Sequence, residues 1–271
     1  MPTNLETSKC FFHYTTREAA FQYILPNGKL RFSALERMRD PLENKEWRWT
    51  GAWFPDPNAP DPHAPEKAFM RFNELASAIR QQAHLLALTI DATTYAPDAA
   101  QFAKGWSRAR MWEQYAEKHE GVCLIFDRDR LIASIGDDLH RQLGIRPYYG
   151  EVSYSERGSG EARNLDLNAV PLDVDGRFVA SYIEDHHRDL FFQKVLDWET
   201  EHEYRFVTTA SPDESLYAEY GDALVGIIVG ERFPDWERPA AIEAGRKVGV
   251  EPLTMDWTMG RPVPTTLKAN P

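Results

Sequence analysis

Two short segments of this chain carry side chains whose types and spacing suit chemistry. The first is His13-Tyr14-Thr15, which follows an apolar pair and is expected on or just past an early strand. The second is Glu201-His202-Glu203-Tyr204-Arg205, far downstream. Because side chains alternate across a strand, Glu201, Glu203 and Arg205 are expected to share one face. Such a polar cluster is either a buried ion network that braces a sheet or a functional site, and the residues alone leave both open.

The bulk composition narrows the class of protein. The chain has 271 residues, 42% hydrophobic and 27% charged, which is ordinary for a globular protein. Its formal net charge of -11 disfavours extended wrapping of nucleic acid and docking on anionic membranes, but not a local basic cleft. We expect a single domain over 1–271, with a proline-rich insertion loop at about 52–66.

Cysteine usage and the lack of apolar runs suggest the compartment. Cys10 and Cys123 form no metal-binding or disulfide spacing, and Cys123 lies in an apolar run typical of a buried strand. No apolar stretch has the length of a membrane span, and the N-terminus lacks a signal pattern. We therefore expect a cytoplasmic protein that has no membrane partner.

The hydrophobic pattern predicts mixed helices and strands. Thr15-Thr16-Arg17-Glu18 has the form of a capping box for a short helix that Pro26-Asn27-Gly28 ends. Ser107 is expected to cap a helix that carries Met111, Trp112, Tyr115 and Ala116 on one face. Further helices are expected at about 66–82, 178–195 and 237–246, and an acidic loop at 156–175. Strands are expected at about 29–33, 84–90, 122–126, 148–154, 202–209, 224–229 and 251–256.

This order of elements favours an α+β fold. The helices and strands do not alternate strictly, so a doubly wound parallel sheet is disfavoured. We expect a mixed or antiparallel, split sheet flanked by helices. No zinc-protease, phosphate-loop, dinucleotide-binding or nucleophile-elbow motif occurs. His186-His187 point apart on a helix, and we predict no metal site.

Several short segments occur in a specific order and spacing. They are His13-Tyr14-Thr15, Gly28 to Ser33, Asp40-Pro41-Leu42-Glu43, Ser107, Met111-Trp112, Tyr115-Ala116, His119 to Leu124, Lys194, Trp198, Glu201, Glu203 and Arg205. Together they resemble the bacterial family known as domain of unknown function 2971, over about residues 11–257. The chain departs from the expected pattern at Arg39, where we expect Asn before Asp40-Pro41.

The layout also resembles, more distantly, ADP-ribosyltransferase-like proteins, and this resemblance implies an NAD-binding core. His13 and Thr15 would hold the nicotinamide side, and Ser107 would belong to the same binding set. An aromatic ring of Tyr14, Trp112 or Tyr115 would stack on nicotinamide. Glu203 would be the catalytic carboxylate, chosen over Glu201 because it lies further inside the predicted strand. Arg205 would keep Glu203 ionised or pair with a pyrophosphate oxygen.

The implied chemistry suits these residues. Breaking the glycosidic bond of NAD+ builds positive charge on the ribose, which a fixed carboxylate stabilises, and a carboxylate also deprotonates an acceptor. The expected function is therefore NAD+-dependent ADP-ribosyl transfer or NAD+ cleavage, as in a bacterial toxin or phage-defence effector, with the acceptor unassigned. A non-catalytic module that senses a nucleotide or nucleic-acid end is the alternative. A 2'-phosphotransferase on the same fold also stays open, because Arg17, Lys29 and Arg31 lie near His13 in sequence.

Three other features have structural interpretations. Asp40 and Glu43, beside Pro41, are expected to fix a loop. Trp47, Trp49 and Trp53 are expected to pack under the proline-rich loop rather than form a recognition surface. Met111, Trp112 and Tyr115 equally suit core packing at helical spacing.

Overall fold

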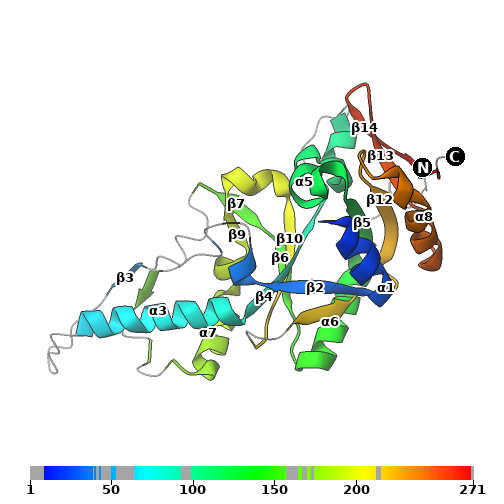
Figure 1. Cartoon of the computed structure of the whole chain (residues 1–271). Coiled ribbons are helices and arrows are strands. Elements are labelled where there is room, and N and C mark those ends of the chain that lie inside the picture. Colours follow the sequence, from blue (N-terminus) through cyan, green and yellow to red (C-terminus); the bar gives the residue numbers. More distant parts are fainter. Residues whose placement is uncertain are drawn as a thin grey trace.

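The computed structural model shows helices on both sides of a large mixed sheet (Figure 1). It describes residues 9–38, 40, 43, 50–52, 64–92, 99–156, 164–166, 170–171, 174–211 and 215–269. The expected combination of helices with a mixed sheet is confirmed. Within these ranges, no helix is both long enough and apolar enough to cross a membrane.

The strands and helices occupy the following segments. The strands are β1 Cys10–Thr15, β2 Lys29–Ala34, β3 Thr50–Ala52, β4 Ala83–Thr89, β5 Val122–Asp127, β6 Tyr148–Glu151, β7 Ser153–Ser155, β8 Asn164–Asp166, β9 Gln193–Val195, β10 Glu203–Thr209, β11 Leu216–Glu219, β12 Leu224–Val229, β13 Leu253–Thr258 and β14 Arg261–Thr266. The α-helices are α1 Leu25–Asn27, α3 Ala64–Gln82, α4 Ala100–Ala103, α5 Ala109–Tyr115, α6 Arg128–Leu143, α7 Gly176–Phe191 and α8 Arg238–Lys247. A π-helix, Ala19–Ile24, precedes α1, and short 3₁₀ helices cover Leu35–Arg37, Gly105–Ser107, Glu117–His119, Leu196–Glu201 and Asp235–Glu237.

The large sheet has the order β11-β2-β4-β1-β5-β12-β13-β14, and β10 joins it by pairing with β4 and β6. Its described pairings are antiparallel except for β12 with β13. Two small parallel pairs, β3 with β8 and β7 with β9, stand beside it.

Strand β4 is the branch point of this sheet. Along one edge it pairs with β10 over its whole length, from Ala83 to Thr89. Its other edge is shared: β2 pairs near the start, through Leu85, and β1 pairs at the end, through Thr89. Strands β1 and β2 therefore leave the same edge of β4 at different heights and diverge from each other. This divergence is where the sheet opens to a cavity.

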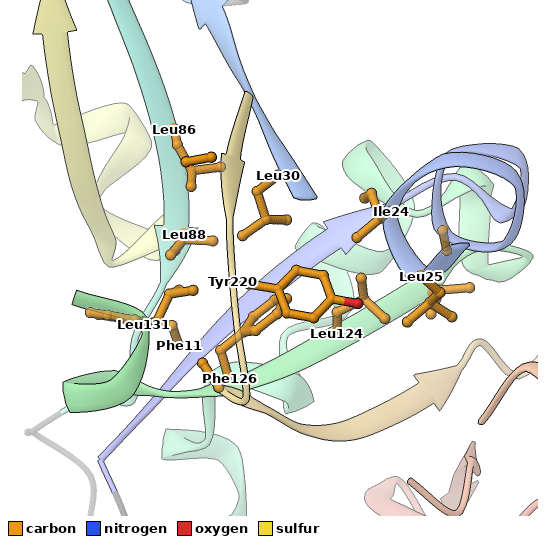
Figure 2. Packing of buried hydrophobic residues seen from close by; sticks show 14 of the residues in the cluster. Phe11, Ile24, Leu25, Leu30, Leu86, Leu88, Leu124, Phe126, Leu131 and Tyr220 are labelled. Carbon is orange, nitrogen blue, oxygen red and sulfur yellow. The ribbon is translucent and has the colours of Figure 1, made fainter. Parts of the chain in front are cut away.

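Apolar clusters cover both faces of the sheet. On one face, Phe11 and Leu124 pack with the Ile24 and Leu25 side chains of the early helical segment (Figure 2). On the other face, α3 and α7 pack over β4 and β10. A third cluster packs α5 against β1 and β5 and includes Trp112. Burial of these side chains is the main source of stability, at about 25 cal/mol for each Å² of apolar surface.

The structure confirms most elements that hydrophobic periodicity predicts. Six elements begin and end within two residues of their predicted bounds: strands β2, β4, β5 and β12 and helices α3 and α8. Strands β11 and β14 were not predicted. Both lie at the ends of the large sheet, where a short segment has a weak apolar pattern of its own.

Two predicted elements have wrong bounds. The helix expected at 178–195 ends at Phe191, and the following residues form β9 and a 3₁₀ turn. The strand expected at 148–154 is broken at Val152 into β6, which pairs with β10, and β7, which pairs with β9. In both cases pairing with distant strands overrides the local pattern.

Two predicted caps are also wrong. The Thr16 hydroxyl, rather than that of Thr15, accepts a hydrogen bond from the Ala19 amide at 3.1 Å, because Thr15 is the last residue of β1. Ser107 does not cap α5, whose cap residue is Arg108. The Ser107 hydroxyl instead donates to the Lys104 carbonyl at 2.7 Å.

Several predictions concern segments only partly described. The 156–175 region contains β8, so the expectation of a continuous loop is wrong there. Most of the proline-rich segment lies outside the described residues, as do Arg39, Pro41, Trp47, Trp49 and Trp53.

Candidate functional site

A cavity of about 240 Å³ lies where β1 and β2 diverge from β4. It combines a polar floor with aromatic and apolar walls. The residues that line it are Phe12, His13, Tyr14, Arg31, Ser33, Arg37, Met38, Asp40, Glu43, Leu85 to Thr89, Met111, Tyr115, Lys194, Glu201 and Glu203. Five of the predicted site residues (His13, Tyr14, Tyr115, Glu201 and Glu203) are therefore brought together by the fold.

Strand β10 supplies the centre of the polar floor. Glu203 and Arg205 lie on one face of the strand, and Tyr204 and Phe206 pack into the core on the opposite face. This is the alternation that the sequence predicts for a strand. Glu203 and Arg205 are both buried.

Glu201 reaches the same place by a different route from the one predicted. It is the last residue of a 3₁₀ turn, not part of β10, and His202 has a left-handed backbone with φ of 44°. Strand alternation therefore does not apply to Glu201. The turn nevertheless directs its buried side chain toward the floor of the cavity.

Lys194, on β9, joins the two carboxylates. Its ammonium group donates to Glu201 Oε2 at 3.0 Å and to Glu203 Oε1 at 2.9 Å. The ammonium also lies 4.9 Å from the centre of the Trp198 ring, a favourable position for a cation. The sequence pattern predicts a helix at Lys194 and gives this residue no functional role, although Lys194 is among the residues that carry the family resemblance.

Arg205 forms the second layer of the network. Its Nε donates to Glu203 Oε2 at 2.6 Å, and its Nη1 lies 2.6 Å from Glu43 Oε1. The same Nη1 also donates to the carbonyl of Phe191, the last residue of α7, at 2.6 Å. Arg205 thus satisfies a carbonyl that the helix end leaves without an internal partner.

Asp40 and Glu43 are buried beside this network, on the segment that follows β2. The sequence predicts that these two residues fix a loop. Their positions on the cavity wall make them site residues as well. A usable signal existed in the Asp40-Pro41-Leu42-Glu43 segment, which was among those that carried the family resemblance.

The carboxyl groups of the cavity differ in acidity. Burial acts to raise the pKa of Glu203, but Arg205 and Lys194 outweigh it and hold the pKa at about 2. Burial raises the pKa of Glu201 against the opposing effect of Lys194. Burial likewise raises the pKa of Glu43, against Arg205. Glu203 is therefore firmly ionised, and Glu201 and Glu43 hold a proton more readily.

Lys194 stays charged in this environment. Burial acts to lower its pKa, but the carboxylate of Glu203, with those of Glu43 and Glu201, raises it above the ordinary value. The positive charge of Lys194 is what allows two carboxyl groups to sit together away from water.

His13 borders two cavities. It lines the first one and also an adjoining cavity of about 630 Å³ that contains Thr15, Lys29 and Arg31 and two exposed tyrosines, Tyr23 and Tyr217. Burial lowers the pKa of His13 to about 4, with a hydrogen bond to the Ala87 backbone acting against it. The imidazole is therefore neutral near pH 7 and can both donate and accept a hydrogen bond.

Three predicted binding residues lie outside both cavities. Trp112 is completely buried in the core, where its Nε1 donates to the Trp106 carbonyl at 2.8 Å and its ring meets Tyr14 edge-on. Ser107 is buried under the same cluster. Arg205 lies behind Glu203 rather than on the cavity surface. A stacking role for Trp112 and direct ligand contacts for Ser107 or Arg205 do not fit these positions.

The donor set of the cavity does not resemble a metal site. Across the part of the chain that the structure describes, no group of three or more His, Cys, Asp or Glu side chains is arranged to hold a metal ion. Lys194 and Arg205 lie beside the carboxylates Glu201 and Glu203, in the positions that a metal ion would need.

Charged side chains of both signs meet at this cavity. Arg205 lies behind Glu203, and the lining itself contains four carboxyl groups (Asp40, Glu43, Glu201 and Glu203) and three cations (Arg31, Arg37 and Lys194). Arg31 also lines the adjoining cavity, together with Lys29. The cavity therefore offers acceptors to hydrogen-bond donors of a ligand and cations to an anionic group.

Comparisons with known proteins match the segment that carries most of this network. Residues 111–206, which include Tyr115, Lys194, Glu201, Glu203 and Arg205, match the family model described as "Protein of unknown function (DUF2971)". The match is narrower than the resemblance expected over 11–257. No curated protein and no solved structure matches the chain significantly. The chain is therefore similar to the DUF2971 family over residues 111–206.

Proposed function

We propose that the cavity between β1 and β2 binds NAD+ and breaks the bond between nicotinamide and ribose, transferring ADP-ribose to water or to an acceptor molecule. The observation that carries this proposal is the pair of buried carboxylates, Glu201 and Glu203, at the floor of a cavity that His13 borders. A core of the ADP-ribosyltransferase type is part of the proposal.

The reaction needs negative charge at one point. When the C1'–N1 bond breaks, its electron pair leaves with nicotinamide, and the ribose carbon acquires oxocarbenium character. The nucleophile then bonds to that carbon and loses a proton. A fixed anion beside the ribose stabilises the developing positive charge, because it is already oriented before the reaction.

The two carboxyl groups suit different parts of this reaction. Glu203, with its pKa at about 2, is ionised and suits electrostatic stabilisation. Glu201 has a raised pKa and accepts a hydrogen bond from the Tyr115 hydroxyl at 2.7 Å. A carboxylate of higher pKa is the better general base. We therefore assign the removal of the nucleophile's proton to Glu201. Glu201 and His13, with Glu203, are the residues expected from the sequence to be catalytic.

The remaining residues suit the binding of a dinucleotide. His13 and Tyr14 line the first cavity and suit contact with the nicotinamide side. The adjoining cavity of about 630 Å³ has the size of a small-molecule site, and Lys29 and Arg31 suit a pyrophosphate there. Thr15 lies on the wall of this second cavity. We propose that the protein acts in the cytoplasm, as a bacterial toxin or a phage-defence effector, because an enzyme with this activity consumes NAD+.

The test is a proton NMR time course of the purified protein with NAD+. We expect free nicotinamide to accumulate with the wild type and at least tenfold more slowly with Glu203→Gln, because the variant lacks the fixed anion. Glu251→Gln, a neutralised exposed carboxylate outside both cavities, is the matched control. Full turnover by Glu203→Gln would remove Glu203 from the catalytic assignment.

One observation favours a second candidate, a non-catalytic nucleotide sensor. Both oxygens of Glu201 and of Glu203 already accept hydrogen bonds or ion pairs from the protein. Such saturation suits a structural network that shapes a binding cavity. Shifted NAD+ signals without release of nicotinamide, also after cell extract is added to supply acceptors, would favour this candidate.

A further inference from the structure

Glu43 differs from the other glutamates of the network in its hydrogen bonding. Its Oε1 lies 2.6 Å from Arg205 Nη1, but its Oε2 is buried and has no hydrogen-bond partner among the described residues. Only 8% of the residue is exposed. Glu201 and Glu203, in contrast, have both oxygens occupied.

A buried acceptor without a donor is costly, and native proteins rarely keep one without reason. Glu43 lines the 240 Å³ cavity. Its Oε2 is closed to water, so a molecule bound there supplies the missing partner once a small rotation of the carboxyl group turns this oxygen toward it. The backbone holds the residue in place, because the Glu43 amide donates to the Asp40 carbonyl at 3.0 Å. The side chain is thus anchored at one oxygen and at its backbone, while the second oxygen is left for a ligand.

The chemistry around Glu43 selects the kind of group that it binds. The free carboxyl oxygen needs a hydrogen-bond donor, so an anionic ligand group that carries no donor does not satisfy it. A hydroxyl group both donates and accepts a hydrogen bond, and it therefore satisfies this oxygen whether the carboxyl is ionised or protonated. An ammonium group satisfies only the ionised form.

We propose that Glu43 Oε2 binds a hydroxyl of the ribose that carries nicotinamide and so determines specificity for a ribosyl ligand. This assignment rests on the proposed function, because it takes NAD+ as the ligand. Glu43 then positions the sugar, while Glu201 and Glu203 act on the bond that breaks. Its loss lowers affinity for the ligand more than it lowers turnover at saturation.

The experiment measures affinity with a probe that cannot react. The probe is benzamide adenine dinucleotide, whose ring is joined to ribose through carbon, with its 2'-deoxy and 3'-deoxy counterparts on the same ribose. Isothermal titration with the wild type is expected to show about tenfold weaker binding for one deoxy counterpart, the effect of one lost hydrogen bond. Glu43→Met, of similar length but without a hydrogen-bonding oxygen, is expected to bind the full probe and that counterpart equally.

Two further variants make the result interpretable. Glu36→Met changes an exposed carboxylate near Glu43 in sequence but outside both cavities. This variant is expected to keep the wild-type ratio between the dissociation constants of the deoxy counterpart and of the full probe. Glu43→Gln keeps hydrogen-bonding groups and is expected to recover part of the discrimination. If Glu43→Met does not fold, the wild type is compared with Glu43→Gln. A ratio that is smaller for Glu43→Gln than for the wild type supports the role of Glu43, and an equal ratio contradicts it.

The outcomes separate this proposal from the proposed function. A wild-type ratio retained by Glu43→Met, or no discrimination by a wild type that releases nicotinamide from NAD+, overturns the role of Glu43 alone. A wild type that neither binds the probe nor releases nicotinamide overturns both.

Discussion

At the scale of single residues, Glu203 and Glu201 show how neighbours set the acidity of one residue type. Glu203 lies between Lys194 and Arg205, and its pKa falls to about 2 in spite of burial. Glu201 shares Lys194 but lacks the guanidinium, and burial raises its pKa. Removal from water raises the pKa of both residues and neighbouring cations lower it. The number of neighbouring cations therefore decides the direction of the pKa shift.

This difference predicts how stability depends on pH. The folded-state pKa of Glu203 is lower than its ordinary value of 4.5, so its contribution to stability is present above pH 4.5 and is lost as the pH falls toward 2. Glu203→Gln is therefore expected to lower the free energy of unfolding by about 3 kcal/mol at pH 7, and this deficit is expected to shrink on acidification. Urea denaturation of both proteins between pH 7 and pH 2 measures it. A deficit that does not change with pH would show that the ion pairs of Glu203 are not its source.

At the scale of elements, short irregular segments bring the site residues together. The 3₁₀ turn and His202 redirect Glu201, and the break between α7 and β9 brings in Lys194. Another irregular segment, Glu117–His119, has three successive residues with left-handed backbone angles. It follows α5, whose Tyr115 hydroxyl binds Glu201. Gly230 lies close to the backbone of this segment, at His119.

Gly230 tests whether that close approach is required. A Cβ atom at Gly230 would overlap the His119 carbonyl oxygen, and the Gly230 amide donates to the Gly121 carbonyl at 2.9 Å. Gly230→Ala is therefore expected to lower the free energy of unfolding by about 1–3 kcal/mol, since rigid backbone must move. At Gly176, in α7, a Cβ atom meets nothing within 4 Å, and Gly176→Ala is the matched control. Equal denaturation midpoints for the two variants in urea would contradict the prediction.

At the scale of the whole molecule, charge is distributed unevenly. The chain has a formal net charge of -11, yet Lys29 and Arg31 lie together beside the larger cavity. A small anionic ligand can use this local region, because nearby charges act within about 8 Å at physiological salt. A long polynucleotide meets the net negative surface as well.

The distribution predicts a limit on nucleic-acid partners. Duplex DNA of about 30 base pairs is expected to show no saturable binding at about 0.15 M salt, because few phosphates find a cation to replace their counterions. Fluorescence anisotropy with labelled duplex measures this, and a single-stranded end of a few nucleotides serves as comparison. Saturable binding of the duplex, weakened by added salt, would contradict the prediction.

The local features of this protein follow from its sequence pattern alone. Period-2 alternation placed Glu203 and Arg205 on one face of a strand, and apolar runs predicted β4, β5 and β12. These signals are readable because they depend on neighbours within a few residues. The His13 strand was likewise predictable from its apolar flank.

Which residues share the cavity depends on how distant segments pack in the folded protein. Glu43 and Lys194 meet Arg205 and Glu203 through segments far apart in the chain, and no local pattern encodes such a meeting. Trp112 is buried in the core, as its helical spacing with Met111 allows. The distant resemblance, and not the periodicity, suggested that it stacks on a ligand. Local periodicity specifies which face of an element is apolar. The branching of β1, β2 and β10 around β4 specifies which polar side chains face one another, and that depends on contacts between distant segments.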